Sequence, residues 1–258
     1  MMQEAVVVGL GQMGAVFAHG LLRIGQSVHP VNRGSCLSEL ASRWEDDEAA
    51  KPSVVVLSVS EDALDDVLSS IPAAVQDRLV LLQNELLPHR WKRHQLSPTV
   101  AVVWFEKKSN TGLRQIVPTK VFGAQAGVVK KVLCSIGIEV IAQESHDGLV
   151  GALVAKNLYI LTSNIAGIMV EGTVSGLLHA HRTLAEDVAA EVLALQQRRC
   201  TEALDAALAL ECMWEAFERD PEHRCRGRSA PERLRRALEQ GAQLGVELPV
   251  LTRISQCL

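Results

Sequence analysis

The chain begins with a short β-branched run that passes through three closely spaced glycines into a periodic apolar stretch. Residues 6–22 read VVVGLGQMGAVFAHGLL, with glycines at 9, 11 and 14. In a dinucleotide-binding fold the first glycine makes a tight turn, the second lets the backbone approach a pyrophosphate, and the third lets helix and strand pack closely. A glycine turn without a ligand has the same local sequence, so the surrounding pattern must decide between the two interpretations.

Short β-rich runs alternate with helical stretches from residue 4 to about residue 143. This alternation favours a parallel sheet that is covered on both faces. Two of the runs, VVVG and VVVL, are apolar throughout, as strands buried on both faces should be. The β-rich runs are AVVVGL, SVHPVNR, SVVVLSV, RLVLLQN, TVAVVWF, IVPTKVFG and GIEVIA.

The glycine motif therefore opens the first βαβ unit of this pattern. In that position a helix N-terminus attracts negative charge and a weak motif becomes specific. We interpret the loop as a cofactor-binding loop. Its expected contact residues are Gly9, Leu10, Gly11, Gln12, Met13 and Gly14.

The β signal disappears after about residue 144, and long helical patterns follow. The sequence predicts an α/β protein with an N-terminal Rossmann-type parallel sheet domain, residues 1–144, and an all-helical C-terminal domain, residues 145–258. In the last long helix, Ser229 is an expected N-cap with Glu232 three residues later, and Gly245 is an expected C-cap. Ser145 or Asp147 is expected to cap the helix that begins the second domain.

Composition excludes several classes of protein. The net charge of −4 gives no reason to expect nucleic-acid binding, and the six cysteines have no CxxC spacing. Reduced thiols in a cytoplasm fit this cysteine pattern best. The N-terminus has no basic region and its apolar run is broken by glycines, so no signal peptide is expected. His179 and His181 form HAH, but no acidic or cysteine partner stands at useful spacing, so no metal site is expected.

One apolar segment, residues 149–170, is long enough to be tested as a membrane span. Lys156, Asn157 and Asn164 near its middle would be costly in lipid. We therefore expect a buried helix between protein layers and no membrane association.

The end of the second expected strand bears on the choice of cofactor. NAD-binding folds place an acidic residue about 20 positions beyond the loop, whereas an arginine there suits the 2′-phosphate of NADP. The sequence SVHPVNRGS offers Asn32 and Arg33 and no acid. A guanidinium can give a phosphate two charge-assisted hydrogen bonds. NADP(H) is therefore the expected cofactor.

Several of these motifs occur together, and the chain resembles the ketopantoate reductases and their relatives. The motifs are GLGQMG, the VNR strand end, LSVSEDALDDVL, LLQNELLP, a lysine followed eight residues later by an asparagine in one apolar helix, and the tail HRCRGRSAPERLRRALEQGAQLGVELPVLTRI. The resemblance covers nearly the whole chain. Only the glycine loop and the lysine helix are specific, and the wider 6-phosphogluconate and β-hydroxyacid dehydrogenase superfamily shares both.

The resemblance implies a cleft between the two domains in which NADPH reduces a 2-keto acid. Lys156 matches the catalytic lysine of the family, and Asn164 matches an asparagine that contacts the substrate. Asn84 in LLQNE matches an asparagine near the nicotinamide, where it is expected to serve both cofactor and substrate. Ser58 and Val59, in LSVSEDALDDVL, are further expected cofactor contacts.

The chemistry of the lysine helix is consistent with that role. Hydride delivery to a carbonyl carbon leaves negative charge on the oxygen, and a nearby ammonium can stabilise the charge and donate a proton. Lys156, Ser163 and Asn164 stand at positions i, i+7 and i+8, so they share broadly one side of a helix. We expect all three to contact the substrate. A lysine that only snorkels or pairs with a carboxylate, and asparagines that are satisfied structural amides, are the alternative interpretations.

Three departures from the family pattern argue against ketopantoate as the substrate. Ile160 stands where the family has an asparagine, and QNG reads QNE, with Glu85 in place of a glycine. The position of the glutamate that would bind the substrate hydroxyl falls near Ser229, with Glu232 one helical turn away. A pocket that has lost polar partners should reject a small polyhydroxylated acid. Ser229 is retained as an expected substrate contact.

The sequence thus predicts an NADPH-dependent reductase of a 2-keto acid or a related carbonyl compound. A nucleotide sensor or scaffold that has lost catalysis, and an imine or opine-type reductase, are the alternatives. The basic runs RCRGR and RLRR either meet a phosphate or, as the overall charge favours, form a solvated helix face. The long apolar helices of the second domain are compatible with a homodimer.

Overall fold

The computed structural model describes residues 3–32, 35, 37–45, 47–108 and 112–258. It contains two compact units, Met1–Leu149 and Val150–Leu258. The first holds the sheet and the second is built from helices, so the predicted α/β class is confirmed. The units divide inside helix α6, His146–Met169, whereas the sequence had suggested a division just before that helix.

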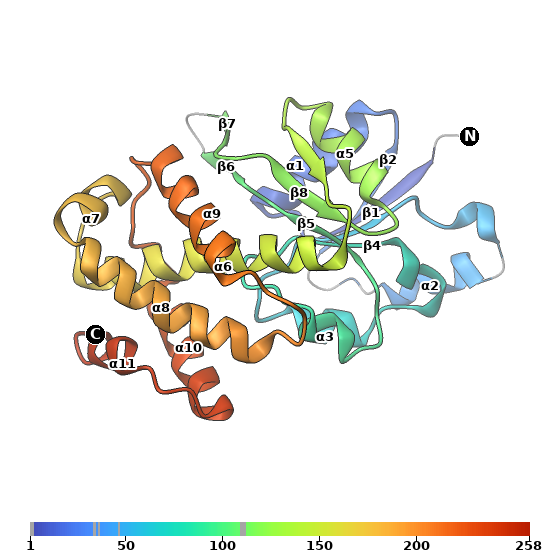
Figure 1. Cartoon of the computed structure of the whole chain (residues 1–258). Coiled ribbons are helices and arrows are strands. Elements are labelled where there is room, and N and C mark those ends of the chain that lie inside the picture. Colours follow the sequence, from blue (N-terminus) through green and yellow to red (C-terminus); the bar gives the residue numbers. More distant parts are fainter. Residues whose placement is uncertain (1–2, 33–34, 36, 46, 109–111) are drawn as a thin grey trace. The chain divides into compact units, whose positions relative to one another are not determined.

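The first unit is built on a seven-stranded sheet in the order β2-β1-β3-β4-β5-β8-β9 (Figure 1). Every pair of neighbours is parallel except β5 and β8, which run antiparallel. Six of the seven strands lie within the β-rich runs that the sequence indicated, and β1 begins one residue before its run. The seven strands are β1 Glu4–Val8, β2 Ser27–Val31, β3 Val55–Leu57, β4 Leu79–Leu81, β5 Thr99–Val102, β8 Thr119–Phe122 and β9 Val140–Ala142.

A hairpin replaces the helix between β5 and β8. Its strands are β6, Phe105–Lys108, and β7, Gly112–Gln115, which pair antiparallel in a small second sheet. A parallel neighbour needs a long crossover, usually a helix, whereas an antiparallel one does not. The direction of β8 follows from this connection, and the sequence analysis had expected neither the hairpin nor the reversal.

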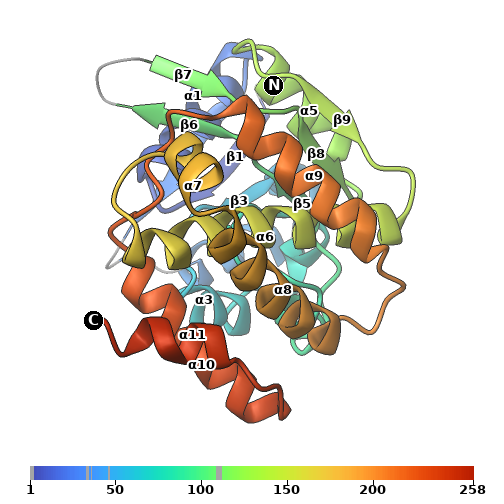
Figure 2. The same ribbon diagram turned by 60° about the vertical axis from the view of Figure 1, so that its left-hand side comes forward.

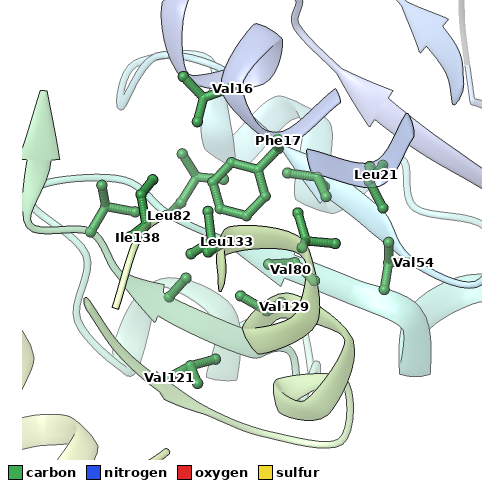
Figure 3. Packing of buried hydrophobic residues seen from close by; sticks show 14 of the residues in the cluster. Val16, Phe17, Leu21, Val54, Val80, Leu82, Val121, Val129, Leu133 and Ile138 are labelled. Atoms are coloured by element: carbon green, nitrogen blue, oxygen red, sulfur yellow. The ribbon is translucent and has the colours of Figure 1, made fainter. Parts of the chain in front are cut away.

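Helices cover both faces of the seven-stranded sheet. Helices α1, Gln12–Arg23, and α5, Ala126–Cys134, pack against each other on one face, and α2 and α3 lie on the other (Figure 1). Figure 3 shows Phe17 and Leu133 from the two packed helices above Val80 of the sheet. Burying each such side chain contributes about 1.5–3 kcal/mol. The remaining helices are α2 Ser38–Glu45, α3 Leu64–Ser69, α4 His89–Lys92 and the 3₁₀ turns Glu48–Ala50 and Ala73–Arg78.

The second unit is organised around α6, which is apolar on all sides. Among the described residues it is the one helix long and apolar enough to cross a membrane, and 89% of its most apolar window is buried in protein. A helix that is hydrophobic all round belongs in a protein core. At its start the Ser145 hydroxyl accepts the N–H of Gly148 at 3.1 Å, so the predicted serine cap is confirmed.

The other helices of this unit are α7 Val174–Ala180, α8 Arg182–Arg199, α9 Ala206–Arg219, α10 Ala230–Leu244 and α11 Pro249–Ser255. Helices α10 and α11 lie side by side, and both contact α8 (Figure 2). Gly245 ends α10 in the left-handed conformation, with φ of +66°, as predicted. Ser229 occupies the N-cap position, but its side chain makes no capping bond, and Glu232 pairs with Arg235 instead.

Candidate functional site

The carboxyl ends of four neighbouring strands bring the expected cofactor residues of the first unit to one edge of the sheet. Gly9 follows β1, Asn32 follows β2, Ser58 follows β3, and Asn84 lies just beyond β4. The strand order reverses between β1 and β3, because β2 lies on one side of β1 and β3 on the other. Open α/β sheets bind their ligands outside the carboxyl ends of the strands at such a switch point.

The glycine loop is closely packed at two of its glycines and open at the third. Gly9 has φ of +87°, and a Cβ there would lie 2.8 Å from the carbonyl oxygen of Ser58. A Cβ on Gly14 would lie 2.0 Å from the carbonyl oxygen of Gly9. At Gly11, by contrast, no atom of the described residues other than its chain neighbours lies within 4 Å of the Cβ position. The described residues therefore leave no room for a side chain at Gly9 or Gly14, and they leave space at Gly11.

The first turn of α1 presents its backbone N–H groups without a competing side chain. Gly11 is the N-cap residue, the described residues provide no side-chain capping bond, and the first turn contains no acidic residue. These N–H groups and the helix dipole favour an anion. Leu10 and Gln12 are exposed, while Met13 is partly buried against the core. The loop therefore presents an uncapped, electropositive backbone surface.

The cofactor-discriminating strand end is described only in part. The side chain of Asn32 is exposed, and its Oδ1 accepts the N–H of Leu10 at 3.3 Å. Asn32 thereby ties the end of β2 to the glycine loop. Arg33 lies outside the described residues, so its expected contact with a 2′-phosphate stays a prediction.

A buried amide joins the loops after β3 and β4. The Nε2 of Gln83 donates to the carbonyl oxygens of Leu57 at 2.8 Å and Val59 at 3.3 Å. The N–H of Asn84 donates to the carboxylate of Glu61 at 3.2 Å, and the Asn84 side chain is half-buried. Gln83 and Glu61 thus hold two expected cofactor contacts in place. Neither residue was predicted from the sequence, although Gln83 directly precedes Asn84.

In the second unit, Lys156 lies over an aromatic ring that is itself held by a buried carboxylate. Lys156 is 7% exposed, and its Nζ lies 5.5 Å from the ring centroid of Tyr159, within the range of a cation–π interaction. The Tyr159 hydroxyl donates to Oδ2 of Asp220 at 3.1 Å. Asp220 is completely buried, and His223 Nδ1 lies 3.4 Å from the same oxygen. This arrangement fixes the ring on which the ammonium rests.

We predict that Tyr159→Phe lowers the free energy of unfolding by about 1–3 kcal/mol, because it removes a donor from a buried carboxylate. The phenylalanine ring preserves the contact with Lys156. Urea unfolding followed by circular dichroism measures the loss. Ser163→Ala is the matched control, because it removes a buried hydroxyl that bonds a backbone carbonyl and no carboxylate. Equal losses in the two variants would contradict the role given to Asp220.

Ser163 and Ser229, two expected substrate contacts, lie in different surroundings. Ser163 is completely buried, and its hydroxyl donates to the carbonyl oxygen of Tyr159 in the preceding turn at 2.7 Å. Ser229 is exposed at the start of α10. The first hydroxyl is thus bonded within its own helix, whereas the second lies at the surface.

Asn164 joins α6 to the segment that leads into α10. It is 3% exposed, and its Nδ2 donates to the carbonyl oxygen of Ile160 at 2.9 Å. Its Oδ1 accepts the N–H of Gly227 at 3.2 Å and Nη1 of Arg233 at 2.9 Å. The sequence analysis did not single out Arg233 as a site residue, although the basic run RLRR contains it. The side-chain amide of Asn164 is therefore occupied by protein partners, and it holds the guanidinium of Arg233 in place.

Within the described part of the chain, no three histidine, cysteine or acidic side chains are grouped so that they could hold a metal ion. His179 and His181, the expected non-ligands, are both exposed around the end of α7.

The whole chain is similar to solved structures of reductases. No protein-family model and no curated protein matches the sequence. The ketopantoate reductase of the PanE/ApbA family from Ralstonia eutropha JMP134 is 16% identical, with 98% of this chain and 96% of that chain covered and a TM-score of 0.65. A dimeric ketopantoate reductase from Staphylococcus aureus is 12% identical, with 98% and 96% covered and a TM-score of 0.63. D-mandelate dehydrogenase in complex with NADH is 12% identical, with 99% and 97% covered and a TM-score of 0.61.

At these identities the similarity concerns the fold. The chain has the fold of the ketopantoate reductases over nearly its whole length, as the resemblance in sequence had implied.

Proposed function

We propose that the protein is an NADPH-dependent reductase of a 2-keto acid or a related carbonyl compound. The observation that carries this proposal is the glycine loop at the β1/β3 switch point, which is closed at Gly9 and Gly14 and open above Gly11. The proteins of similar fold include ketopantoate reductases and a mandelate dehydrogenase bound to NADH. Both support a nicotinamide cofactor and a 2-hydroxy or 2-keto acid substrate.

The first unit provides the residues that would hold the cofactor. The pyrophosphate would lie over Gly11 and the uncapped first turn of α1, where the backbone supplies N–H donors. Leu10, Gln12 and Met13 belong to the same loop and first turn. The contacts of the ribose and the nicotinamide would come from Asn32, Arg33, Ser58, Val59 and Asn84. When bound, the cofactor supplies the hydride.

We predict that Arg33→Ala weakens NADPH binding at least about tenfold and leaves NADH binding within about twofold. A charge-assisted pair with the 2′-phosphate accounts for a loss of that size. Titrations that follow nicotinamide fluorescence give both dissociation constants. Arg23→Ala is the control, because this substitution removes the same charge from the last turn of α1, elsewhere in the unit. An unchanged ratio of the two constants in Arg33→Ala would remove the preference for NADP(H).

In the second unit, Lys156 would supply the proton. The reaction requires its ammonium to reach the carbonyl oxygen of a substrate beside the nicotinamide, where it would stabilise the developing negative charge. The contact with the Tyr159 ring restricts the orientation of the lysine side chain. Asn84, Ser163, Asn164 and Ser229 are the other proposed substrate contacts, and Asn164 would act partly through the guanidinium that it holds.

A nucleotide sensor without catalysis is the second candidate. Its support is that Ser163 and Asn164 are bonded to neighbouring parts of their own unit. A screen of 2-keto acids for oxidation of NADPH separates the two functions. A reductase would oxidise NADPH with at least one acid, whereas a sensor would bind the nucleotide and oxidise it with none. An imine or opine-type reductase would need an amine as well as a keto acid in the same screen.

The remaining proposals concern assembly and location. We place the protein in the cytoplasm, where its thiols would stay reduced, and the described cysteines Cys134, Cys200, Cys212, Cys225 and Cys257 are free. A homodimer through the helical unit is supported by the dimeric ketopantoate reductase of similar fold.

A further inference from the structure

A segment rich in arginine is fixed along α6 in the second unit. We call residues 224–233, RCRGRSAPER, the arginine segment. A Cβ on Gly167 of α6 would lie 2.6 Å from the backbone of Cys225, so helix and segment approach closely there. Arg224 pairs with Thr173 in an isolated bridge. These contacts hold the backbone of the segment in one position against the helix.

Side chains of the segment alternate between buried and exposed positions. Cys225 is 1% exposed, and a Cβ on Gly227 would lie 2.7 Å from Oδ1 of Asn164, so these two positions face α6. Arg224, Arg226 and Arg228 are exposed. The three arginines are therefore open to solvent, while the two positions between them contact α6.

Arg233 differs from these three because a buried amide holds its guanidinium. It lies in the first turn of α10, is half-buried, and donates through Nη1 to Oδ1 of Asn164. The same oxygen accepts the N–H of Gly227, so one side chain of α6 fixes both the segment and the arginine. Asn164 follows Lys156 by eight residues, a rise of about 12 Å along the helix. Two cations are thus associated with one helix, about two turns apart.

The charge of this region is strongly positive. Residues 224–236 contain six arginines and one acidic residue, Glu232. Glu232 pairs with Arg235 and Arg236 on α10. The arginine segment therefore carries a net positive charge, although the chain as a whole carries −4. A local field of this kind attracts anions.

We infer that Arg233, positioned by Asn164, binds a second acidic group of the substrate. This inference rests on the proposed reductase function and narrows its substrate class to 2-keto acids that carry a terminal carboxylate. Guanidinium and carboxylate can form two parallel hydrogen bonds, which makes arginine selective for such a group. A site built to bond a polar group discriminates strongly against an analogue that lacks it.

Calorimetric titration of the protein with two matched acids tests the inference. 2-Oxoglutarate and 2-oxopentanoate have the same number of carbons and differ at the terminal group, which is a carboxylate in the first and a methyl in the second. NADP⁺ is present in one series and absent in the other, so neither turnover nor nucleotide binding is needed for the measurement. We expect 2-oxoglutarate to bind at least about tenfold more tightly, and Arg233→Gln to reduce that preference to less than about threefold.

Two further variants separate recognition from folding. Arg233→Lys keeps the charge without the paired donors and should retain an intermediate preference. Arg235→Gln removes a neighbouring arginine that pairs with Glu232 and Glu239, and should leave the preference unchanged. Equal affinity for the two acids, binding of neither, or a full preference in Arg233→Gln would overturn the inference. Reduction of 2-oxopentanoate by NADPH would still support the proposed function, so failure of the inference and failure of that function are distinguishable.

Discussion

Replacement of Lys156 by alanine should lower kcat about 10³-fold or more in the reduction of any keto acid that the protein accepts. Proton donation by a positioned group contributes about 10²–10⁴-fold, and loss of one donor to a developing oxyanion costs about 10²–10³-fold. Affinity for NADPH should stay within about twofold, because the residues proposed to hold it belong to the first unit. Single-turnover absorbance measurements give the rate, and fluorescence titration gives the affinity.

The structure suggests a control that separates chemistry from packing. Lys156 is buried and lies over the ring of Tyr159, so alanine also leaves a cavity. Lys156→Met keeps an unbranched side chain of similar length and removes the charge. The methionine variant should unfold near the wild-type urea concentration and show the same loss in kcat. A methionine variant that turns over within about threefold of the wild type would refute the role of the ammonium.

The fold could be predicted where the residues of a strand reflect how the strand is buried. VVVG and VVVL are apolar throughout because β1 and β3 are buried on both faces. The hairpin was missed because Leu113 and Arg114 in β7 are exposed, and its residues show no apolar alternation. Without the hairpin, the antiparallel direction of β8 could not be predicted, since it depends on the kind of connection that precedes the strand.

In the candidate site too, local features could be predicted from the sequence and distant contacts could not. Glycines with set roles at fixed spacing, and a lysine within an apolar helix, are visible in the sequence because the constraint is local. Partners that are remote along the chain are not visible. The bond between Asn164 and Arg233 spans 69 residues, and the bond between Asn84 and Glu61 spans 23. The sequence therefore singled out Asn164 and Asn84 as expected site residues, but it did not indicate that Arg233 and Glu61 bond to them.

Substitution of Gly11 by valine should strongly weaken nucleotide binding while leaving the fold intact. Its backbone has φ of −72° and ψ of −164°, which an L-residue adopts without strain, and among the described residues only its chain neighbours can lie within 4 Å of the Cβ position. A valine would occupy the space in which the backbone must approach the pyrophosphate. We expect NADPH affinity to fall about 100-fold or more, and the melting temperature to change by no more than about 2 °C. Fluorescence titration and calorimetric melting measure the two effects.

Gly14→Ala provides the opposite result from the same loop. Its Cβ would lie 2.0 Å from the carbonyl oxygen of Gly9, a backbone atom that cannot move without opening the turn. Overpacking of this kind costs about 1–3 kcal/mol, and more where the backbone must shift. The alanine should therefore lower the melting temperature of the protein without nucleotide. If Gly11→Val destabilised the protein as much as Gly14→Ala, the loop would be a turn that needs every glycine for packing. A loop that binds a dinucleotide should lose affinity in Gly11→Val and stability in Gly14→Ala.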